Sequence, residues 1–498
     1  MFPRSLQLTH VANGLLFLAL LSTSLANANP LRPRDSQTSP ASHVNPLFGR
    51  ECASTDIWPK GPGNALVPQA PTAELRRMLA QIDPKRVNAT ITKLVSFGTR
   101  HTLSSQTDPV RGIGAARDWL AAEMRSIAAG AARGTNITIT VPSYIQQPAS
   151  RIPTPTNISD VVATIHGASD ANRVYVITGH YDSRVTDIMN FTDDAPGADD
   201  DGSGVAVVLE LLRIMSQRPP PAATIMLGAV AGEEQGLFGA DHLAQILFDA
   251  GADVQGMFTN DIVGSSKADD GTIDPFSIRL FAEGIPATGS NASQISTLES
   301  IGGENDSPAR ELARFVNEVA TNDATGMSVR VIYRLDRFLR GGDHEPFLER
   351  GFPAARFTEP HENFAHQHQD VRVDPVTGQQ FGDLIEFCDF DFIARVAKVN
   401  GAALWSLAQA PGTPKNVIID TSVLTNNSTL LWEHGSDEGL AGYEVVWRPT
   451  IAPFWTNVIP VGLVNKVTVN VSKDNAVLGV RAVGRNGYRS PAALPFPG

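Results

Sequence analysis

The apolar positions in the middle of the chain follow two alternating spacings. Short apolar runs typical of buried strands lie at 137–141, 161–165, 174–177, 224–230, 254–261, 329–333 and 354–357. Between them, apolar residues recur at intervals of three and four, as on one face of a helix, at 72–82, 113–127, 205–215, 237–248, 311–319 and 392–407. This alternation predicts an α/β fold with a mainly parallel central sheet flanked by helices.

The pattern changes after a break rich in Pro and Gly at 410–414. From residue 417 onward, short runs of alternating character are separated by Gly, Asn, Asp and Ser, which predicts a C-terminal antiparallel β-sandwich over 414–498. Trp432, Tyr443 within Gly-Tyr-x-Val, and Val480 within Val-x-Ala-Val resemble a fibronectin type III domain. An unrelated β-sandwich is the alternative.

The first residues have the form of an export signal. Arg4 precedes an apolar run at 14–25, and the Ala-Asn-Ala sequence at 26–28 has the small-x-small form that signal peptidase cleaves. We therefore expect a signal peptide at 1–28 and a secreted, extracellular protein. Residues 29–70 are rich in Pro, Ser and Asn without periodicity and are expected to form an extended arm or a propeptide, ahead of a main domain at 71–410.

Composition narrows the possible functions. The chain has 498 residues, enough for two domains, and its net charge of -12 is accompanied by no basic run, so we expect no nucleic-acid partner. No run after the signal reaches the roughly 20 apolar residues that a membrane span needs. Export is further supported by Asn-x-Ser/Thr sequons, which predict a glycoprotein and occur at Asn88, Asn136, Asn157, Asn190, Asn291, Asn426, Asn427 and Asn470.

The two cysteines, Cys52 and Cys388, are expected to form one disulfide in an oxidising compartment. That bond would tie the N-terminal arm to the end of the main domain. Neither cysteine has a histidine close to it in sequence, so a thiol nucleophile is not expected.

Polar residues with ligand chemistry follow three of the expected strands. His180 ends one strand, and Asp182 stands two residues later, where its carboxylate could fix the imidazole tautomer. The segment 197–204 reads Gly-Ala-Asp-Asp-Asp-Gly-Ser-Gly, and its small residues permit a rigid turn that could present a carboxylate to two metal ions. This segment lacks the alternating Asp pattern of an EF-hand.

Glu233 and Glu234 follow the strand at 224–230. Adjacent carboxylates repel each other unless a cation neutralises them or one is protonated, so one Glu is expected to bind metal and its neighbour to act as a base. Asp261 is a further acid at the end of a strand. A last ligand is expected in the segment 359–370, where His361, His366 and His368 compete.

These motifs, in this order, are similar to those of the co-catalytic zinc aminopeptidase family, which includes aminopeptidase Y, two-zinc leucyl aminopeptidases and glutamate carboxypeptidase. The resemblance covers about residues 70–410. It implies metal ligands at His180, Asp200, Glu234, Asp261 and His366. In this reading His180 and Asp261 hold one zinc, Glu234 and His366 hold the other, and Asp200 bridges the two.

The resemblance also implies Glu233 as general base and Asp182 as the group that orients His180. His366 is preferred to His368 because Asp370 stands four residues after it, as in the family. A Gly-Asp-His-x-Pro-Phe segment at 342–347 is a further family feature near the substrate cleft.

The sequence thus predicts a secreted zinc exopeptidase that removes N-terminal residues from peptides, with two zincs activating a bridging water. Three alternatives stay open on the same fold: a one-zinc aminoacyltransferase similar to glutaminyl cyclase, a carboxypeptidase acting on acidic peptides, and a non-catalytic binding protein. The side-chain preference of such an enzyme is not predictable, because loops form the pocket walls.

Overall fold

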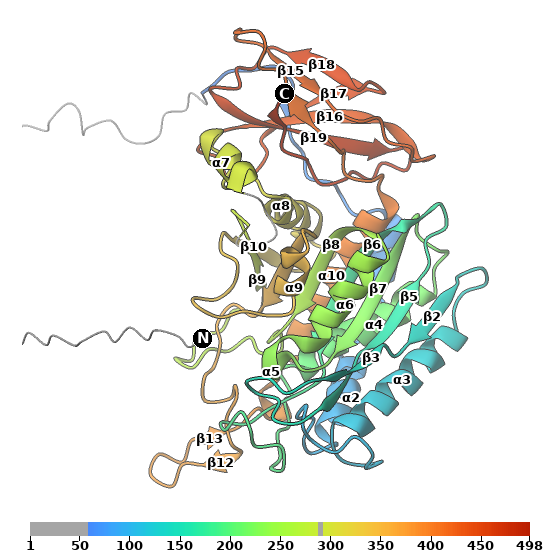
Figure 1. Cartoon of the computed structure of the whole chain (residues 1–498), viewed down its shortest axis with the longest axis vertical. Coiled ribbons are helices and arrows are strands. Elements are labelled where there is room, and N and C mark those ends of the chain that lie inside the picture. Colours follow the sequence, from blue (N-terminus) through green and yellow to red (C-terminus); the bar gives the residue numbers. More distant parts are fainter. Residues whose placement is uncertain (1–57, 287–291) are drawn as a thin grey trace, which may run out of the picture. The chain divides into compact units, whose positions relative to one another are not determined.

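The computed structural model describes residues 58–286 and 292–498, and the unit from Trp58 to Gly498 is compact. Its largest element is an eight-stranded sheet in the order β10-β9-β11-β8-β6-β7-β5-β2 (Figure 1). The strands are β2 Ile137–Thr140, β5 Val161–Ile165, β6 Asp170–His180, β7 Ala223–Val230, β8 Asp253–Asn260, β9 Ser277–Ala282, β10 Ser328–Ile332 and β11 Ala354–Thr358.

The four central strands β11, β8, β6 and β7 are all parallel to one another. β9 runs antiparallel to β11, and β5 runs antiparallel to β7. The mainly parallel sheet that the sequence predicts is therefore confirmed, with antiparallel strands added towards both edges.

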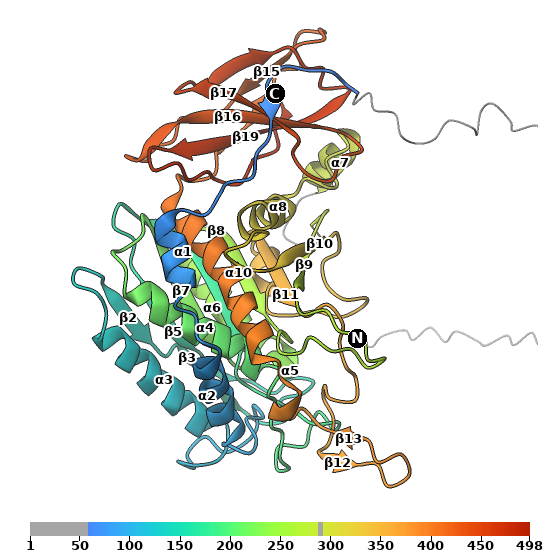
Figure 2. The same cartoon turned by 180° about the vertical axis from the view of Figure 1, so that it is seen from behind.

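Helices cover both faces of this sheet, as Figures 1 and 2 show from opposite sides. One face packs against α1 Ala73–Leu79, α2 Pro84–Val95, α3 Ile113–Ala129, α4 Gly202–Ser216, α8 Pro308–Ala320 and α10 Phe390–Gln409. The other face packs against α6 Phe238–Asp249 and α9 Glu345–Glu349. Along β7, Leu227 points into the first core and Val230 into the second, as expected for a strand buried on both faces.

Helix α2 and strand β9 are among the elements that the hydrophobic pattern does not indicate. Helix α2 begins with Asp83, whose side chain accepts from Lys85 N, and Pro84 follows at the first helical position. The Asp-Pro start signal and the apolar Val87, which is buried, are the sequence features that indicate helix α2. The hydrophobic pattern does not indicate strand β9, because its six residues mix apolar side chains with Ser277 and Arg279.

Helix α4 lies unusually close to the strand β6. A Cβ on Gly179 would come within 2.6 Å of the Gly204 carbonyl carbon, so the two backbones approach more closely than side chains allow. The helix begins at Asp201, whose carboxylate accepts from Gly204 N at 3.0 Å and from His180 N at 2.9 Å. These contacts fix the 197–204 segment directly against the end of β6.

The C-terminal region forms two four-stranded sheets, in the orders β1-β17-β16-β19 and β18-β15-β14-β20. Their strands are β1 Asn64–Ala65, β14 Ile418–Ile419, β15 Ser428–Leu431, β16 Leu440–Pro449, β17 Asn457–Gly462, β18 Lys466–Val469, β19 Ala476–Gly484 and β20 Phe496–Pro497. Trp432, Tyr443 and Trp447 are buried in the core of this region. The pairing is antiparallel except between β14 and β20, and the fibronectin type III resemblance stays a prediction.

The remaining elements are short. They are β3 Ser143–Gln146, β4 Thr156–Ser159, β12 Arg372–Val373, β13 Gln380–Phe381, α5 Glu233–Gly236, α7 Ala292–Ser300 and the 3-10 helix η1 Ile385–Phe387. No helix among the described residues is long and apolar enough to cross a membrane.

Several expectations concern residues outside the described ranges. The signal peptide at 1–28, Cys52 and most of the arm at 29–70 lie there, so the disulfide with Cys388 stays a prediction. The described part of the arm contacts the C-terminal sheets: Asn64 pairs with Val458, and the Trp447 ring N–H donates to Pro62 O at 2.9 Å.

Candidate metal centre

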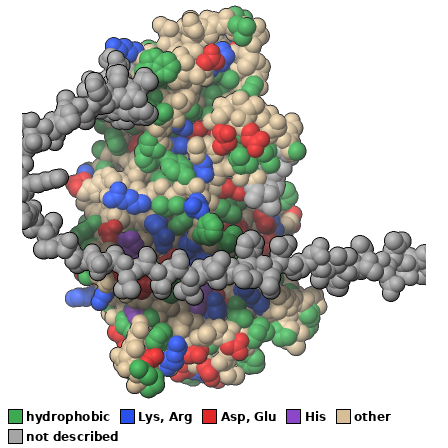
Figure 3. All heavy atoms as spheres, turned by 90° about the vertical axis from the view of Figure 1, so that its left-hand side faces the viewer, with side chains coloured by type: hydrophobic (Ala, Val, Ile, Leu, Met, Phe, Trp, Pro, Cys, Tyr) green, Lys and Arg blue, Asp and Glu red, His purple; other side chains and the backbone are tan. Residues whose placement is uncertain are grey.

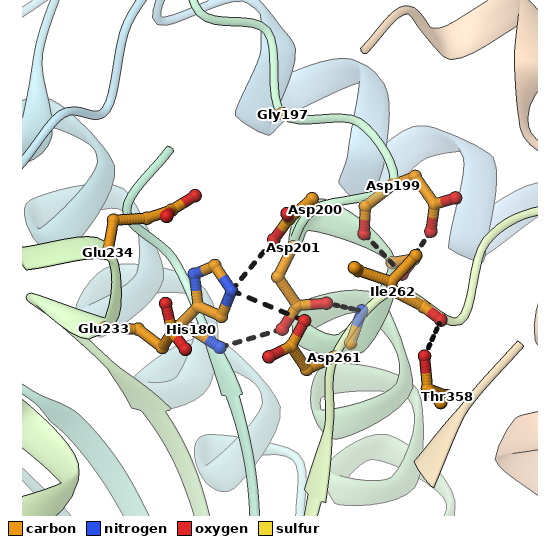
Figure 4. Close-up of polar contacts among 12 residues, drawn as sticks. His180, Gly197, Asp199, Asp200, Asp201, Glu233, Glu234, Asp261, Ile262 and Thr358 are labelled. Carbon is orange, nitrogen blue, oxygen red and sulfur yellow. Dashed lines mark hydrogen bonds and ion pairs between the residues drawn. The ribbon is translucent and has the colours of Figure 1, made fainter. Parts of the chain in front are cut away.

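The carboxyl ends of the four central strands bring the candidate ligands together (Figure 4). His180 is the last residue of β6, Asp261 directly follows β8, and Glu234 lies four residues beyond β7. The loop after β11 carries His368. Since parallel strands place their carboxyl ends at one edge of a sheet, residues far apart in sequence meet there.

Two groups of three ligand atoms share Asp200. In the first group, His180 Nε2 lies 3.0 Å from Asp200 Oδ1 and 3.8 Å from Asp261 Oδ1. In the second, His368 Nε2 lies 2.7 Å from Asp200 Oδ2 and 3.0 Å from Glu234 Oε1. Each oxygen of the Asp200 carboxylate therefore faces a different group, which is the arrangement of a bridging ligand.

The donor set fits a pair of divalent cations. His180 Nε2 and Glu234 Oε1 are buried. Each lies 3.0 Å from an atom of a neighbouring ligand residue, but neither makes a hydrogen bond of good geometry among the described residues. Buried polar atoms without a partner are costly, and coordination to a cation would satisfy both. Imidazole nitrogen with carboxylate oxygen is a donor set that zinc accepts.

The surrounding carboxylates make the site strongly negative. Burial by itself lowers the pKa of His180, but the carboxylates of Asp182 and Asp200 outweigh burial and raise that pKa well above its usual range. The same field that favours a proton on this ring would attract a metal cation.

Asp182 holds the segment that carries the two glutamates. Its carboxylate accepts from Glu233 N at 3.3 Å and from Glu234 N at 3.1 Å. His180 Nδ1 lies 3.2 Å from the Asp182 carbonyl oxygen and 3.6 Å from its Oδ1. Asp182 thus contacts His180 chiefly through its main chain, while its carboxylate positions the start of α5.

Glu233 belongs to neither ligand group, and its side chain lies beside the His180 ring (Figure 4). Burial raises the pKa of its carboxyl well above the usual range, and the neighbouring charge of Asp261 raises it further. A carboxyl with a raised pKa is suited to accept a proton near neutral pH.

The expectation for His366 is corrected by the structure. The His366 ring stacks on Phe387 with centroids 3.6 Å apart, and it takes part in neither ligand group. His368 turns into the site instead, with a φ of 53° that few residues other than glycine adopt. Asp370, which guided the choice of His366, accepts from Thr186 N at 3.3 Å and so anchors the loop rather than the ligand.

Three supporting residues gave no signal in the sequence. Asp383 accepts from Asp199 N and Asp200 N, both at 2.8 Å, and so fixes the bridging residue. Arg184 Nε donates to Glu234 Oε2 at 2.7 Å, and Arg356 pairs with Asp261 Oδ1 at 2.9 Å. Only contacts made by folding identify them, because each lies in a segment without a recognisable ligand motif.

Asp343, in the Gly-Asp-His-x-Pro-Phe segment, is buried close to the centre. Neither of its carboxylate oxygens has a hydrogen-bond partner among the described residues. Burial raises its pKa to about 7, against the opposing effect of His180. The segment thus adds a further acid to the negative field of the site.

Comparison with known proteins gives the family. The family model described as "Peptidase family M28" matches residues 160–386, which include every residue of the two ligand groups. A protein of Pyrenophora teres f. teres named "Probable zinc metalloprotease" is 57% identical over 448 residues, spanning 90% of this chain and 92% of that protein. The chain belongs to peptidase family M28.

A second similar peptidase, also named "Probable zinc metalloprotease", comes from Pyricularia oryzae. It is 52% identical over 499 residues, spanning 97% of this chain and 98% of that protein. Among solved structures, the LapA aminopeptidase of Legionella pneumophila is 17% identical with a TM-score of 0.48, covering 70% of this chain and 78% of that chain. This last likeness concerns the fold alone.

Proposed function

We propose that this M28 peptidase is a two-zinc exopeptidase that removes N-terminal residues from peptides. The observation that carries the proposal is the pair of ligand groups joined by Asp200, since one carboxylate facing two groups is the geometry of a co-catalytic centre. The names of the fungal relatives support zinc as the metal. His180, Asp200 and Asp261 would hold one ion, and Asp200, Glu234 and His368 the other.

Zinc bound there would supply a Lewis acid for the scissile carbonyl and would lower the pKa of a water molecule. Glu233 would take the proton from the attacking water and return it to the departing amine. Asp182 would fix the position of Glu233, because its carboxylate accepts a hydrogen bond from Glu233 N.

The acidic surroundings support action at the N-terminus. The carboxyl groups of Glu233 and Asp343 lie near the centre in addition to the ligand carboxylates, and their oxygens could accept hydrogen bonds from the α-amine of a substrate. Zinc-loaded protein incubated with aminoacyl amides and with the same peptides blocked at the N-terminus tests this. An aminopeptidase releases free amino acids from the unblocked series only.

Replacing Glu233 with Gln is expected to reduce kcat by roughly 100- to 10,000-fold, because the general base is lost while the ligand atoms are kept. Elemental analysis of the variant should still find two zincs per chain. A variant that retains full activity would show that another group takes the proton.

Product analysis separates the peptidase from a one-zinc cyclase. Cyclisation of an N-terminal glutamine releases ammonia and no free amino acid, whereas hydrolysis releases the amino acid. A metal content of one zinc per chain would also contradict the proposal.

We also propose that the peptidase is a secreted glycoprotein. The sequon residues Asn136, Asn426, Asn427 and Asn470 are exposed, which supports access for glycosylation. N-terminal sequencing of protein taken from the medium, together with glycosidase treatment, tests this.

A further inference from the structure

Next to the metal centre, three arginine side chains converge on one buried carboxylate, Glu362. Arg279 Nη2 lies 3.1 Å from Glu362 Oε1, while Arg337 Nη1 and Arg340 Nη1 lie 3.3 and 3.0 Å from Glu362 Oε2. We refer to Arg279, Arg337 and Arg340 as the arginine cluster. Their side chains come from β9 and from the loop that follows β10.

The arginine cluster holds more positive charge than its carboxylates neutralise. Arg337 also pairs with Asp336 at 3.0 Å, but Asp336 is shared with Arg356 at 3.1 Å. Among the described residues, Arg279 and Arg340 have no carboxylate within ion-pair distance other than Glu362. Glu362 is thus the one carboxylate that pairs directly with these two guanidinium groups among the described residues, although the charge of Glu359 also acts on Arg279.

The arginine cluster is linked to both ligand groups. The Gln367 side-chain amide lies between the arginine cluster and the bridging ligand, and its Nε2 lies 3.5 Å from Asp200 Oδ2. With the amide turned by 180°, its oxygen accepts from Arg340 Nη2 at 2.9 Å and its nitrogen donates to Glu362 Oε2 at 3.0 Å. On the other side, Asp336 pairs with Arg356, which pairs with Asp261. One residue therefore separates the arginine cluster from the bridging ligand.

Sheet register places Arg279 at the same edge as the ligands. β9 is antiparallel to β11, and Arg279 pairs with Thr358, the last residue of β11. The carboxyl end of β11 leads into the loop that carries His368. Arg279 thus lies beside the entry of that loop rather than at the far edge of the sheet.

The arginine cluster is accessible from solvent. The Arg340 side chain is 34% exposed and that of Arg279 is 23% exposed. Figure 3 shows arginine or lysine, acidic and histidine side chains gathered in the recessed middle of one face. On the loop that carries Arg340, the side chains of Phe338 and Leu339 are 76% and 92% exposed.

We propose that the arginine cluster is a subsite for a carboxylate of the peptide substrate, close to the bond that is cleaved. This inference rests on the proposed peptidase function and assigns it a substrate class. A guanidinium fork binds a carboxylate through charge-assisted hydrogen bonds, and Arg340 and Arg279 supply the uncompensated charge for it. The carboxylate belongs either to an acidic side chain next to the scissile bond or to the C-terminus of a short peptide.

Matched peptide pairs test the subsite and distinguish the two sources. The pair Leu-Glu-Gly-amide and Leu-Gln-Gly-amide tests an acidic side chain after the bond, and Glu-Leu-amide and Gln-Leu-amide test one before it. The pair Leu-Gly and Leu-Gly-amide tests the C-terminus. In at least one pair, kcat/KM of the zinc-loaded enzyme should be roughly tenfold or more higher for the carboxylate, the scale of one charged hydrogen bond.

In the variants Arg340→Gln and Arg279→Gln, the ratio of kcat/KM for the carboxylate peptide to kcat/KM for its neutral partner should fall close to one. The change should come chiefly from a higher KM for the carboxylate peptide. Activity on the neutral member of the pair should fall much less than activity on the carboxylate member, because a neutral peptide makes no charge-assisted contact with the arginine cluster. Arg334→Gln is the matched control: Arg334 lies on the same loop, contacts the Phe338 ring and is exposed. The Arg334→Gln variant removes one positive charge, as the other two variants do, and should leave the preference for the carboxylate peptide unchanged.

A wild-type enzyme that cleaves both members of every pair equally overturns the subsite while leaving the peptidase function intact. The subsite is also overturned if Arg334→Gln loses the carboxylate preference as much as Arg340→Gln and Arg279→Gln do, because that result would indicate a long-range charge effect. If the wild type cleaves no peptide, the proposed function fails instead. Calorimetric binding of the same pairs to the zinc-loaded Glu233→Gln variant then still decides the subsite: tighter binding of the carboxylate member supports it, and equal binding overturns it.

Discussion

Two of the candidate ligand side chains are each held through one atom while another atom faces the site. His180 is held through Nδ1 by the Asp182 carbonyl, which leaves Nε2 facing Asp200. Glu234 is held through Oε2 by Arg184, which leaves Oε1 facing His368 Nε2 at 3.0 Å. Such supporting contacts fix the ligand geometry before a metal arrives, so less ordering accompanies binding.

The choice between the two candidate histidines is testable. His368→Ala should lose one zinc and reduce kcat/KM by more than about 100-fold, because a metal that supplies several kcal/mol of stabilisation loses a ligand. His366→Ala removes a ring that stacks on Phe387 and should change activity by less than about threefold. Metal analysis with steady-state kinetics on both variants measures this, and a larger loss in His366→Ala would restore the expectation from the sequence.

At the scale of elements, helix α4 positions the bridging carboxylate by its closeness to the sheet. Asp200 directly precedes the residue that caps the helix, and Asp201 links that cap to the main chain of His180. This connection requires glycine at 204, since a Cβ there would come within 2.6 Å of the Asp201 carboxylate. The helix start, the strand end and the bridging ligand therefore form one rigid unit.

Gly204→Ala is expected to destabilise the protein by about 1–3 kcal/mol, the usual cost of overpacking, and to weaken zinc binding as the turn shifts. Thermal unfolding and zinc titration measure the two effects. Gly439→Ala serves as the control, because a Cβ at Gly439 would meet no atom within 4 Å. Equal stability of both variants would contradict the close approach.

At the scale of the whole described unit, buried charges join α8 to the C-terminal sheets. Asp306 Oδ1 accepts from Arg314 at 3.0 Å and from Arg448, on β16, at 2.6 Å. All three side chains are at most 4% exposed. Trp455 adds a hydrogen bond to Glu311 at 2.8 Å. The C-terminal region therefore packs on the peptidase region through a specific polar network.

Asp306→Ala should cost about 3–5 kcal/mol of stability, because it leaves the buried Arg448 guanidinium without its carboxylate and Arg314 with Glu311 alone. Asp323→Ala is the comparison: Asp323 pairs with Arg76 on the surface, with exposures of 78% and 43%, and solvent screens such a pair, so this variant should unfold like the wild type. Denaturant unfolding measures both. Zinc content and activity at low temperature should be unchanged in each variant, since neither residue contacts the centre.

The sequence by itself determined the α/β architecture and four of the candidate ligands, which lie at or after the ends of central strands. Strands buried on both faces must be continuous apolar runs, and parallel strands deliver their ends to one edge, so His180, Asp200, Glu234 and Asp261 were predictable as neighbours. Their motifs are short and local, and the chain order of these motifs was sufficient to indicate a two-metal centre.

The tertiary structure alone decided between His366 and His368, because the outcome depends on a left-handed turn and on stacking against Phe387. It alone brought the arginine cluster to the centre, since β9 and the loop after β10 reach Glu362 only through sheet pairing and chain reversal. Local patterns record which residues a chain buries, whereas contacts between loops depend on packing that no local pattern encodes.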